Sequence, residues 1–345
     1  MKLESEVSLG SDQGTDPEGS SETGLDPKAW PADYGDPLEE YEATQDGAVL
    51  INVPSAALLS VKGQNAVQFI NGLVTNDVKS LERGHGTLAA FLDVHGKVLA
   101  LTRIYRTESE EVEFLIELEE INREKIYKNL SRFVLAGGFF ISDITPGTAV
   151  VAVQGPQAYA VLEQLSGKAV DVRPFTHSIR RMVGIEVRAT LNQRCSSQGF
   201  DLFVSRDQVS DLWSSLITIC GPSGLRAAGS TAFHTARIEA GIPKEPDDIT
   251  PENILLEAGM DEAVSYTKGC YLGQEIIARI HWRGQPARRL CQLRIDTEQV
   301  PPPGTDLFSL ENRRVGSITS STRSPRFQAV IALGYVHRYH LTAGT

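Results

Sequence analysis

A single cysteine, Cys270, stands between a glycine and a tyrosine in the stretch KGCYLGQE, which spans residues 268–275. Three isoleucines follow this stretch at helical spacing, so the pattern predicts a helix that begins at Gly273 or Gln274. The thiol would then lie just outside the positive end of the helix dipole, with the ammonium group of Lys268 close to it. Both influences favour the thiolate, and the pattern therefore predicts a reactive cysteine with a lowered pKa.

The remaining residues of this motif would shape the helix entry. Gly269 and Gly273 bracket Tyr271 and allow backbone angles that other residues resist. Glu275 falls in the first helical turn, where the dipole favours a carboxylate. A glycine-rich helix entry around a buried, unreactive cysteine accounts for the same spacing equally well, so spacing alone leaves both interpretations open.

The other three cysteines, Cys195, Cys220 and Cys291, form no C-x-x-C pair and have no histidine at zinc-binding spacing. They are predicted to pack as small apolar residues, without disulfides and without a metal site. Neither His234 nor His281 stands at a spacing from the motif cysteine that supports a Cys–His nucleophile.

Negative charge is concentrated at the N-terminus of the 345-residue chain. Residues 1–46 contain 13 Asp or Glu and two Lys, a net charge of −11, which equals the formal net charge of the whole chain. The remainder is neutral and offers no electrostatic footprint for nucleic acid. Because residues 1–46 hold mostly Ser, Gly, Pro and acidic residues, they are predicted to form a disordered, solubilising tail.

The composition also excludes several protein classes. No apolar run is long enough for a membrane helix, and the first residues lack the basic and apolar segments of a secretory signal. The hydrophobic content of 41% and the charged content of 22% are those of a globular protein. We expect a cytoplasmic protein with no membrane partner.

After the tail, hydrophobic periodicity predicts two blocks that mix helices with meandering strands, over residues 47–145 and 146–285. In the first block, two strand-like runs flank a turn at His95 and Gly96. An amphipathic helix is expected over 121–135. Its inward-facing residues would be Ile121, Ile126, Leu130 and Phe133.

Residues 286–345 have a different pattern. Four short strand-like runs are separated by turn sequences such as Pro-Pro-Pro-Gly and Ser-Pro, which is typical of a small closed or sandwiched β domain. The predicted fold class is therefore α+β, with two lobes followed by a small β-barrel.

Several of these segments resemble a known family. The string KGCYLGQE closely resembles the signature of YgfZ-type proteins, which are relatives of the glycine-cleavage T-protein. The resemblance extends from Val49 to Val336 and leaves the acidic tail outside. Further stretches similar to the family's pattern are LSVKGQNAVQFINGLVTNDVKSL, AAFLDVHGKVL, VAVQGP, RIEAGIP and GSITSSTRSP with IALGYV.

This resemblance implies two intertwined ferredoxin-like lobes and a C-terminal β-barrel around a folate-binding opening. It also implies a function. YgfZ-type proteins support the assembly or repair of iron–sulfur clusters in a tetrahydrofolate-dependent way, and their client enzymes include radical enzymes that modify tRNA. On this interpretation the cofactor is tetrahydrofolate, the partners are iron–sulfur clients or assembly factors, and Cys270 with Lys268 does the chemistry.

Two positions depart from the T-protein itself, which moves an aminomethyl group to tetrahydrofolate. T-proteins carry an Asp-Asp pair where this chain has Ala100 and Leu101, and apolar residues cannot accept a proton. T-proteins also carry a glutamate that holds the pterin, where this chain has Ser197 in CSSQGF. Both departures favour an accessory protein over a freestanding aminomethyltransferase.

The resemblance transfers folate contacts to RIEAGIP and TNDV. Arg237 could pair with folate carboxylates, or it could form an ion pair with Glu239 that braces a helix end. Phe233, one helical turn earlier, could stack on a pterin or belong to the core. Asn76 and Asp77 could reach the cavity, but capping a turn is the preferred interpretation.

Three hypotheses follow. The first is a folate-dependent accessory protein for iron–sulfur enzymes. The second is a folate-dependent one-carbon transferase of the T-protein type, which requires a cavity carboxylate that replaces the missing Asp pair. The third is a binding module that has lost folate and acts through protein contacts alone.

Overall fold

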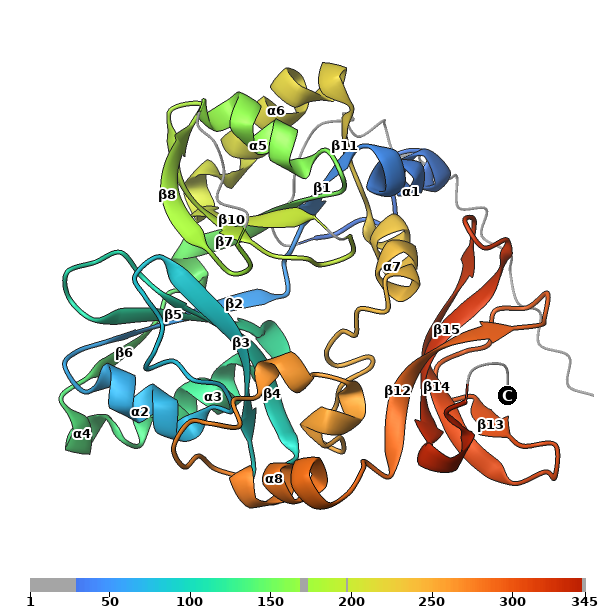
Figure 1. Cartoon of the computed structure of the whole chain (residues 1–345). Coiled ribbons are helices and arrows are strands. Elements are labelled where there is room, and N and C mark those ends of the chain that lie inside the picture. The colour runs from blue at the N-terminus through green and yellow to red at the C-terminus, as the bar shows by residue number, and fades with distance from the viewer. Residues whose placement is uncertain (1–28, 168–172, 197, 343–345) are drawn as a thin grey trace, which may run out of the picture.

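The structure of the protein is a computed structural model that describes residues 29–167, 173–196 and 198–342. These residues form two α+β lobes and a C-terminal β domain, as the sequence predicts (Figure 1). Residues 1–28 of the tail predicted over residues 1–46 lie outside the described residues, as does Ser197, where T-proteins carry a glutamate. No helix in the described part of the chain is long and apolar enough to cross a membrane.

The first lobe is a five-stranded antiparallel sheet, ordered β3-β4-β5-β2-β6, with helices on one face. Its hairpin β3–β4 turns at His95 and Gly96, as predicted. Helices α2 and α3 cover the sheet through Ile70 and Ile126. The elements are β2 (Ala56–Lys62), α2 (Ala66–Leu73), β3 (His85–Leu92), β4 (Val98–Arg106), β5 (Glu113–Glu119), α3 (Glu120–Ser131), α4 (Val134–Gly137) and β6 (Phe140–Asp143).

The second lobe is a six-stranded sheet, ordered β11-β1-β7-β10-β9-β8, in which only the β11–β1 pair is parallel. Helices α5 and α6 pack on one face through Leu162 and Trp213. The elements are β1 (Ala48–Asn52), β7 (Thr148–Gln154), α5 (Ala158–Ser166), β8 (His177–Met182), β9 (Ile185–Leu191), β10 (Gly199–Ser205), α6 (Val209–Cys220) and β11 (Leu225–Ala227).

The two lobes are intertwined. Strand β1 comes first in the chain but joins the sheet of the second lobe, and the next strand, β2, joins the first lobe. A shared core forms between the sheets, where Leu58 and Tyr105 of the first lobe meet Ile51 and Phe203 of the second. Helix α7 (Ser230–Glu239) closes this core at one end. The sequence block 47–145 therefore contributes one strand to the second lobe.

The C-terminal domain is a small β-barrel-type domain with strands in the order β12-β15-β14-β13. Ile238 of helix α7 packs against Ile331 and Leu333 of this domain. Helix α8 (Gln274–Arg283) precedes the domain and packs on the first lobe through Ile277. The strands are β12 (Arg288–Ile295), β13 (Asp306–Phe308), β14 (Arg314–Ser324) and β15 (Ala329–His337).

The prediction of a disordered tail was wrong for residues 37–46, which form helix α1 (Pro37–Asp46). Asp36 caps this helix by accepting a hydrogen bond from the Leu38 amide at 2.8 Å, and the proline at the first helical position suits its start. Tyr41 packs into the shared core beside helix α7. The predicted tail followed from the acidic composition alone, which takes no account of these capping and packing signals.

The inward-facing residues predicted for the amphipathic helix are confirmed only in part. In α3, Ile126 and Leu130 are buried as expected, but Ile121 is 67% exposed and Phe133 is 48% exposed. The buried stripe runs through Asn122, four residues before Ile126, so Ile121 points away from it. Phe133 lies beyond the last residue of the helix and leaves the stripe.

Candidate functional site

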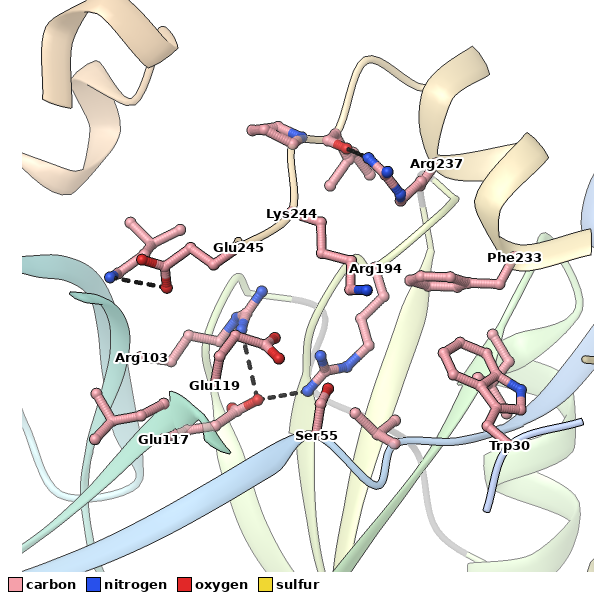
Figure 2. A pocket seen from close by; sticks show the side chains of 16 residues that line it. Trp30, Ser55, Arg103, Glu117, Glu119, Arg194, Phe233, Arg237, Lys244 and Glu245 are labelled. Carbon is pink, nitrogen blue, oxygen red and sulfur yellow. Dashed lines mark hydrogen bonds and ion pairs between the residues drawn. The ribbon is translucent and has the colours of Figure 1, made fainter. Parts of the chain in front are cut away.

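A cavity lies beside the shared core, between the two lobes and helix α7 (Figure 2). Strands β1, β4 and β5 form its floor, and residues 242–245 close its other side. The enclosed space is narrow, about 60 Å³, but it shares four lining residues with an adjoining hollow of about 360 Å³. These shared residues are Trp30, Phe233, Arg237 and Lys244. A ligand larger than a few water molecules would therefore extend across both spaces.

Arg194 joins the two lobes at the floor of this cavity. Its Nε and Nη2 atoms donate to the two carboxylate oxygens of Asp201 on β10, at 2.7 and 2.9 Å. Nη2 also donates to Glu117 on β5. Burial alone would raise the pKa of Glu117, but Arg194 and Arg103 hold that pKa below its ordinary value. Glu117 is therefore an ionised carboxylate that balances two arginines.

Glu245 places a second carboxyl group in the cavity, against strand β4. Its Oε2 atom accepts a hydrogen bond from the backbone amide of Leu101 at 3.1 Å, and the residue is only 7% exposed. Burial raises the pKa of Glu245 to about 7, and the neighbouring Glu119 carboxyl acts in the same direction. A group with this pKa exchanges a proton at neutral pH, as general acid–base catalysis requires.

Glu245 lies beside one of the two positions at which T-proteins carry the Asp pair. Leu101 is one of the two apolar residues that stand where T-proteins carry aspartates, and its amide holds the Glu245 carboxyl. A third carboxyl, that of Glu119, also lines the cavity, and burial raises its pKa as well. The carboxylate required by the transferase hypothesis is thus present, although another segment of the chain supplies it.

Aromatic side chains form the opposite wall. Phe233 and Trp30 lie 4.9 Å apart between ring centroids, and both line the cavity and the adjoining hollow. The Trp30 indole N–H donates to the Ala228 carbonyl at 3.1 Å, which fixes its ring. Phe233 thus lines the cavity and also packs against the shared core, so its predicted place in the core is confirmed in part, and its stacking on a pterin stays a prediction.

Arg237 lies in the wall but is committed to a structural network. It is 1% exposed, and it donates to Asp248 Oδ2 at 2.7 Å and to Ser320 Oγ at 2.8 Å. The predicted Arg237–Glu239 pair does not form. Glu239 instead accepts hydrogen bonds from Tyr41 and Ser324, away from the cavity lining. Within the Arg237 guanidinium, the Nε atom is buried without a hydrogen-bond partner.

Asn76 and Asp77 do not line the cavity. The Asn76 amide donates to three oxygens of neighbouring segments, including the carbonyls of Leu88 and Glu262 at 2.8 and 2.9 Å. Asp77 accepts a hydrogen bond from the Lys79 amide at 2.9 Å, as in a turn. The capping interpretation therefore describes Asp77, whereas Asn76 ties its segment to strand β3 and to the carbonyl of Glu262.

Lys268 is a structural lysine. Its ammonium group donates to the carbonyls of Asn71, Val74 and Asn76 at 2.6, 2.7 and 2.8 Å, which uses all three of its protons. Burial lowers the pKa of Lys268 to about 8, and Asp77 partly opposes this shift. The lysine therefore holds the chain after helix α2 and has no proton left to donate to the neighbouring thiol.

The glycine-rich motif fixes helix α8 on the β3–β4 turn. The helix begins at Gln274, as predicted, and Gly273 before it has a φ of +82°. A Cβ atom on Gly273 would lie 2.6 Å from the Asp93 carbonyl oxygen, so only glycine fits. Tyr271 is buried in the adjoining core, whereas Glu275 is exposed and pairs with Arg279. Gly269 has open space around it.

Cys270 is exposed, which agrees with the predicted accessibility of its thiol. It does not line the cavity, however, and the motif packs on the first lobe through Tyr271, as helix α8 does through Ile277. Among the other cysteines, Cys195 and Cys220 are buried as predicted, whereas Cys291 is only partly buried. No group of residues that could hold a metal ion occurs in the described ranges.

The sequence did not identify most of the polar residues of the cavity. Arg103 and Glu117 are cross-strand neighbours on β4 and β5 of the first lobe, and Arg194 of the second lobe reaches Glu117 only where the two lobes pack together. Glu245 follows the RIEAGIP segment by two residues, so the resemblance at that segment was a signal that could have found it. Trp30 lies in the part of the chain that was predicted to be disordered, so it was not considered as a cavity residue.

Two family models match the chain. The model described as the GCVT N-terminal domain matches residues 30–268, and the model described as the glycine cleavage T-protein C-terminal barrel domain matches residues 288–345. Proteins named aminomethyltransferase are similar along most of their length. That of Halalkalibacterium halodurans is 26% identical over 92% of this chain and 86% of its own. That of Shouchella clausii is 29% identical over 86% and 80%.

A solved structure has the same fold. The glycine cleavage system aminomethyltransferase T from Bartonella henselae superposes with a TM-score of 0.80, covering 89% of this chain and 83% of its own, at 24% identity. At that identity the likeness establishes the arrangement of the lobes and the barrel. The chemistry depends on the residues of the cavity.

Proposed function

The chain belongs to the glycine cleavage T-protein family, and from this premise we propose that it is a tetrahydrofolate-dependent one-carbon transferase of the aminomethyltransferase type. The observation that carries the proposal is the Glu245 carboxyl, held by the Leu101 amide inside the cavity. The narrower YgfZ-type resemblance rests on the KGCYLGQE motif and remains a hypothesis about this chain.

The residues of the cavity fit a folate. Phe233 and Trp30 offer aromatic surface for a pterin, and Lys244 extends into the cavity as a cation (Figure 2). The Nε atoms of Arg103 and Arg237 are buried without hydrogen-bond partners. An anionic ligand would supply the acceptors that these two N–H groups lack. Bound tetrahydrofolate would supply the nitrogens that accept the one-carbon unit.

Glu245 would handle protons and charge during transfer. Its ionised form can accept a proton from the reacting amine, or it can stabilise an iminium-like charge that develops beside it. Because its pKa is about 7, both protonation states are populated at neutral pH. Glu119 shares the cavity and, when ionised, favours retention of the Glu245 proton.

Reconstitution tests this proposal. The protein is supplied in place of the aminomethyltransferase in a reconstituted glycine cleavage system with tetrahydrofolate and glycine labelled with ¹³C at its methylene carbon. Mass spectrometry should detect labelled one-carbon folate, and Glu245→Gln should lower its rate of formation by about 10²-fold. Glu124→Gln, an exposed change outside the cavity, serves as the matched control. Tetrahydrofolate binding without any label transfer would refute the transferase proposal.

A second candidate function rests on Cys270. Its thiol is exposed on the motif, and Ala100 and Leu101 themselves supply no carboxylate to the cavity. These features favour a folate-dependent accessory role for iron–sulfur enzymes, in which the thiol contacts a client. Cys270→Ala should then fold normally, bind tetrahydrofolate and fail to restore iron–sulfur enzyme activity in cells that lack the native protein. Full restoration by this variant would exclude a role for the thiol.

A further inference from the structure

The loop over residues 242–248, the cavity loop, carries two of the charged side chains of the cavity. Lys244 and Glu245 extend from this loop into the cavity (Figure 2). The backbone of Lys244 is fastened to Asp248, at the end of the same loop. The Lys244 amide donates to Asp248 Oδ2 at 3.1 Å, and the Asp248 amide donates to the Lys244 carbonyl at 2.7 Å. Glu245 is therefore flanked by two residues that hold each other in place.

The Asp248 carboxylate contacts two different parts of the molecule with its two oxygens. Oδ2 accepts the Lys244 amide and also the Arg237 Nη1 atom of helix α7, the latter at 2.7 Å. Oδ1 accepts hydrogen bonds from Thr319 Oγ1 at 2.5 Å and from Ser320 Oγ at 2.7 Å, both on strand β14. A carboxylate offers about four acceptor positions, and donors of the protein occupy all of them here.

The C-terminal β domain contacts this network at two further points. The Tyr335 hydroxyl of strand β15 donates to the Asp248 carbonyl at 2.9 Å. Ser320 Oγ accepts from Arg237 Nη2 at 2.8 Å, so its own proton is directed to Asp248. Arg237 in turn fastens the start of the cavity loop, because the Ile242 amide donates to its carbonyl at 2.9 Å. Helix α7, the cavity loop and the β domain thus share one hydrogen-bonded joint.

This joint is closed to water. Asp248 and Arg237 are each 1% exposed, so a donor that is lost from the network is not replaced by solvent. On the opposite side of the loop, the Leu101 amide of strand β4 holds the Glu245 carboxyl at 3.1 Å. The cavity loop therefore bridges the first lobe and the C-terminal β domain.

We propose that Asp248 is a positioning residue, through which Thr319 and Ser320 of the C-terminal β domain hold Lys244 and Glu245 in the cavity. The β domain is then a part of the site, although no described residue of that domain lines the narrow cavity itself. This inference rests on the proposed function only for the reaction that the loop serves. The placement of the loop is tested without it.

Hydrogen exchange at the Leu101 amide measures that placement in the full chain. Because this amide donates to Glu245, its exchange rate reports how often the carboxyl leaves it. Thr319→Val and Ser320→Ala, combined in one chain, remove both hydroxyl donors to the joint. The ratio of the exchange rate at Leu101 to that at Leu202 on strand β10 should then rise by about tenfold in NMR of ¹⁵N-labelled protein. An equal rise at both amides would indicate a general loss of stability and would contradict the positioning role.

Ser321→Ala is the matched control. Ser321 adjoins Ser320 on strand β14, but its hydroxyl donates to the Pro301 carbonyl at 2.5 Å, within the C-terminal β domain. Its removal should leave the exchange ratio within about twofold of the wild-type value. Thr319→Ser keeps a hydroxyl at this position and should also retain the wild-type ratio, whereas Thr319→Val should raise it.

The rate of one-carbon transfer supplies the second readout. If the proposed function holds, the double variant should transfer label about tenfold more slowly than the wild type, because Glu245 is less often in place. Thr319→Ser should transfer it at the wild-type rate. A folded double variant with an unchanged exchange ratio would overturn the inference. A raised ratio, together with a wild-type protein that transfers no one-carbon unit, would uphold the inference and refute the proposed function, so the two failures are distinguishable.

Discussion

The protonation of Glu245 should govern the pH dependence of the cavity. Its ionised form is the one that can accept a proton, so one-carbon transfer should rise as the pH increases through about 7. In Glu245→Gln this rise should disappear along with most of the activity. The measurement is the rate of label transfer between pH 5.5 and 8.5, the interval of about 1.5 units on each side of the midpoint. An unchanged pH profile in the variant would assign the titration to another group.

The same carboxyl should also affect stability. Its folded pKa of about 7 lies above the ordinary value of 4.5, so between these values the unfolded chain loses a proton that the folded chain keeps. Stability from this group is therefore present at low pH and is lost as the pH rises through that window. Above pH 7, Glu245→Gln should be more stable than the wild type by about 1–3 kcal/mol, with no difference below pH 4.5. Urea unfolding at pH 4 and pH 8 measures this difference.

Lys268 offers a residue-scale test of whether the motif lysine activates the thiol. Lys268→Met leaves three carbonyl oxygens without their donor, so the free energy of unfolding should fall by about 2–4 kcal/mol. The rate at which iodoacetamide alkylates Cys270 in the folded protein should stay within about twofold, because the lysine donates nothing to the thiol. A tenfold slower alkylation would restore the activating role predicted from the sequence.

At the scale of elements, Gly273 decides how helix α8 meets the first lobe. Gly273→Ala places a side chain at a φ of +82° and against the Asp93 carbonyl, so it should destabilise the protein by about 2–4 kcal/mol. Gly269→Ala lies in the same motif but meets no atom within 4 Å and should cost less than about 1 kcal/mol. Thermal unfolding of the two variants, compared at equal concentration, measures the contrast. Equal losses would show that the clash at Gly273 is relieved by movement of the turn.

The elements also show which structural features sequence patterns can predict and which they cannot. The β3–β4 hairpin and the start of α8 were predictable, because both depend on local turn and periodicity signals. The buried face of α3 was predictable only at Ile126 and Leu130, since a polar residue, Asn122, occupies the first turn where the pattern favoured Ile121. Likewise Phe233 followed from a motif, whereas Arg194 of the second lobe and Glu117 of the first lobe are brought together only by the packing of the lobes.

At the scale of the whole molecule, one buried arginine connects the two lobes. Arg194 lies between Asp201 on the second sheet and Glu117 on the first, and all three residues are buried. Removing a single member of a buried charge network leaves the others without compensation, which typically costs about 3–5 kcal/mol. The intertwined lobes should therefore lose much of their mutual stability when this arginine is removed.

The corresponding prediction is that Arg194→Met lowers the free energy of unfolding by about 3–5 kcal/mol, and that Glu117→Gln with Asp201→Asn in the same chain recovers part of this loss. Arg226→Gln is the control, because Arg226 and its partner Glu39 are both more than half exposed, and it should change stability by less than about 0.5 kcal/mol.

Urea unfolding followed by Trp213 in the second lobe and by far-ultraviolet circular dichroism measures the effect. Since the arginine couples the lobes, the two probes should coincide in the wild type and separate in Arg194→Met. Coincident transitions in that variant, at wild-type stability, would mean that the shared apolar core joins the lobes without help from the charge network.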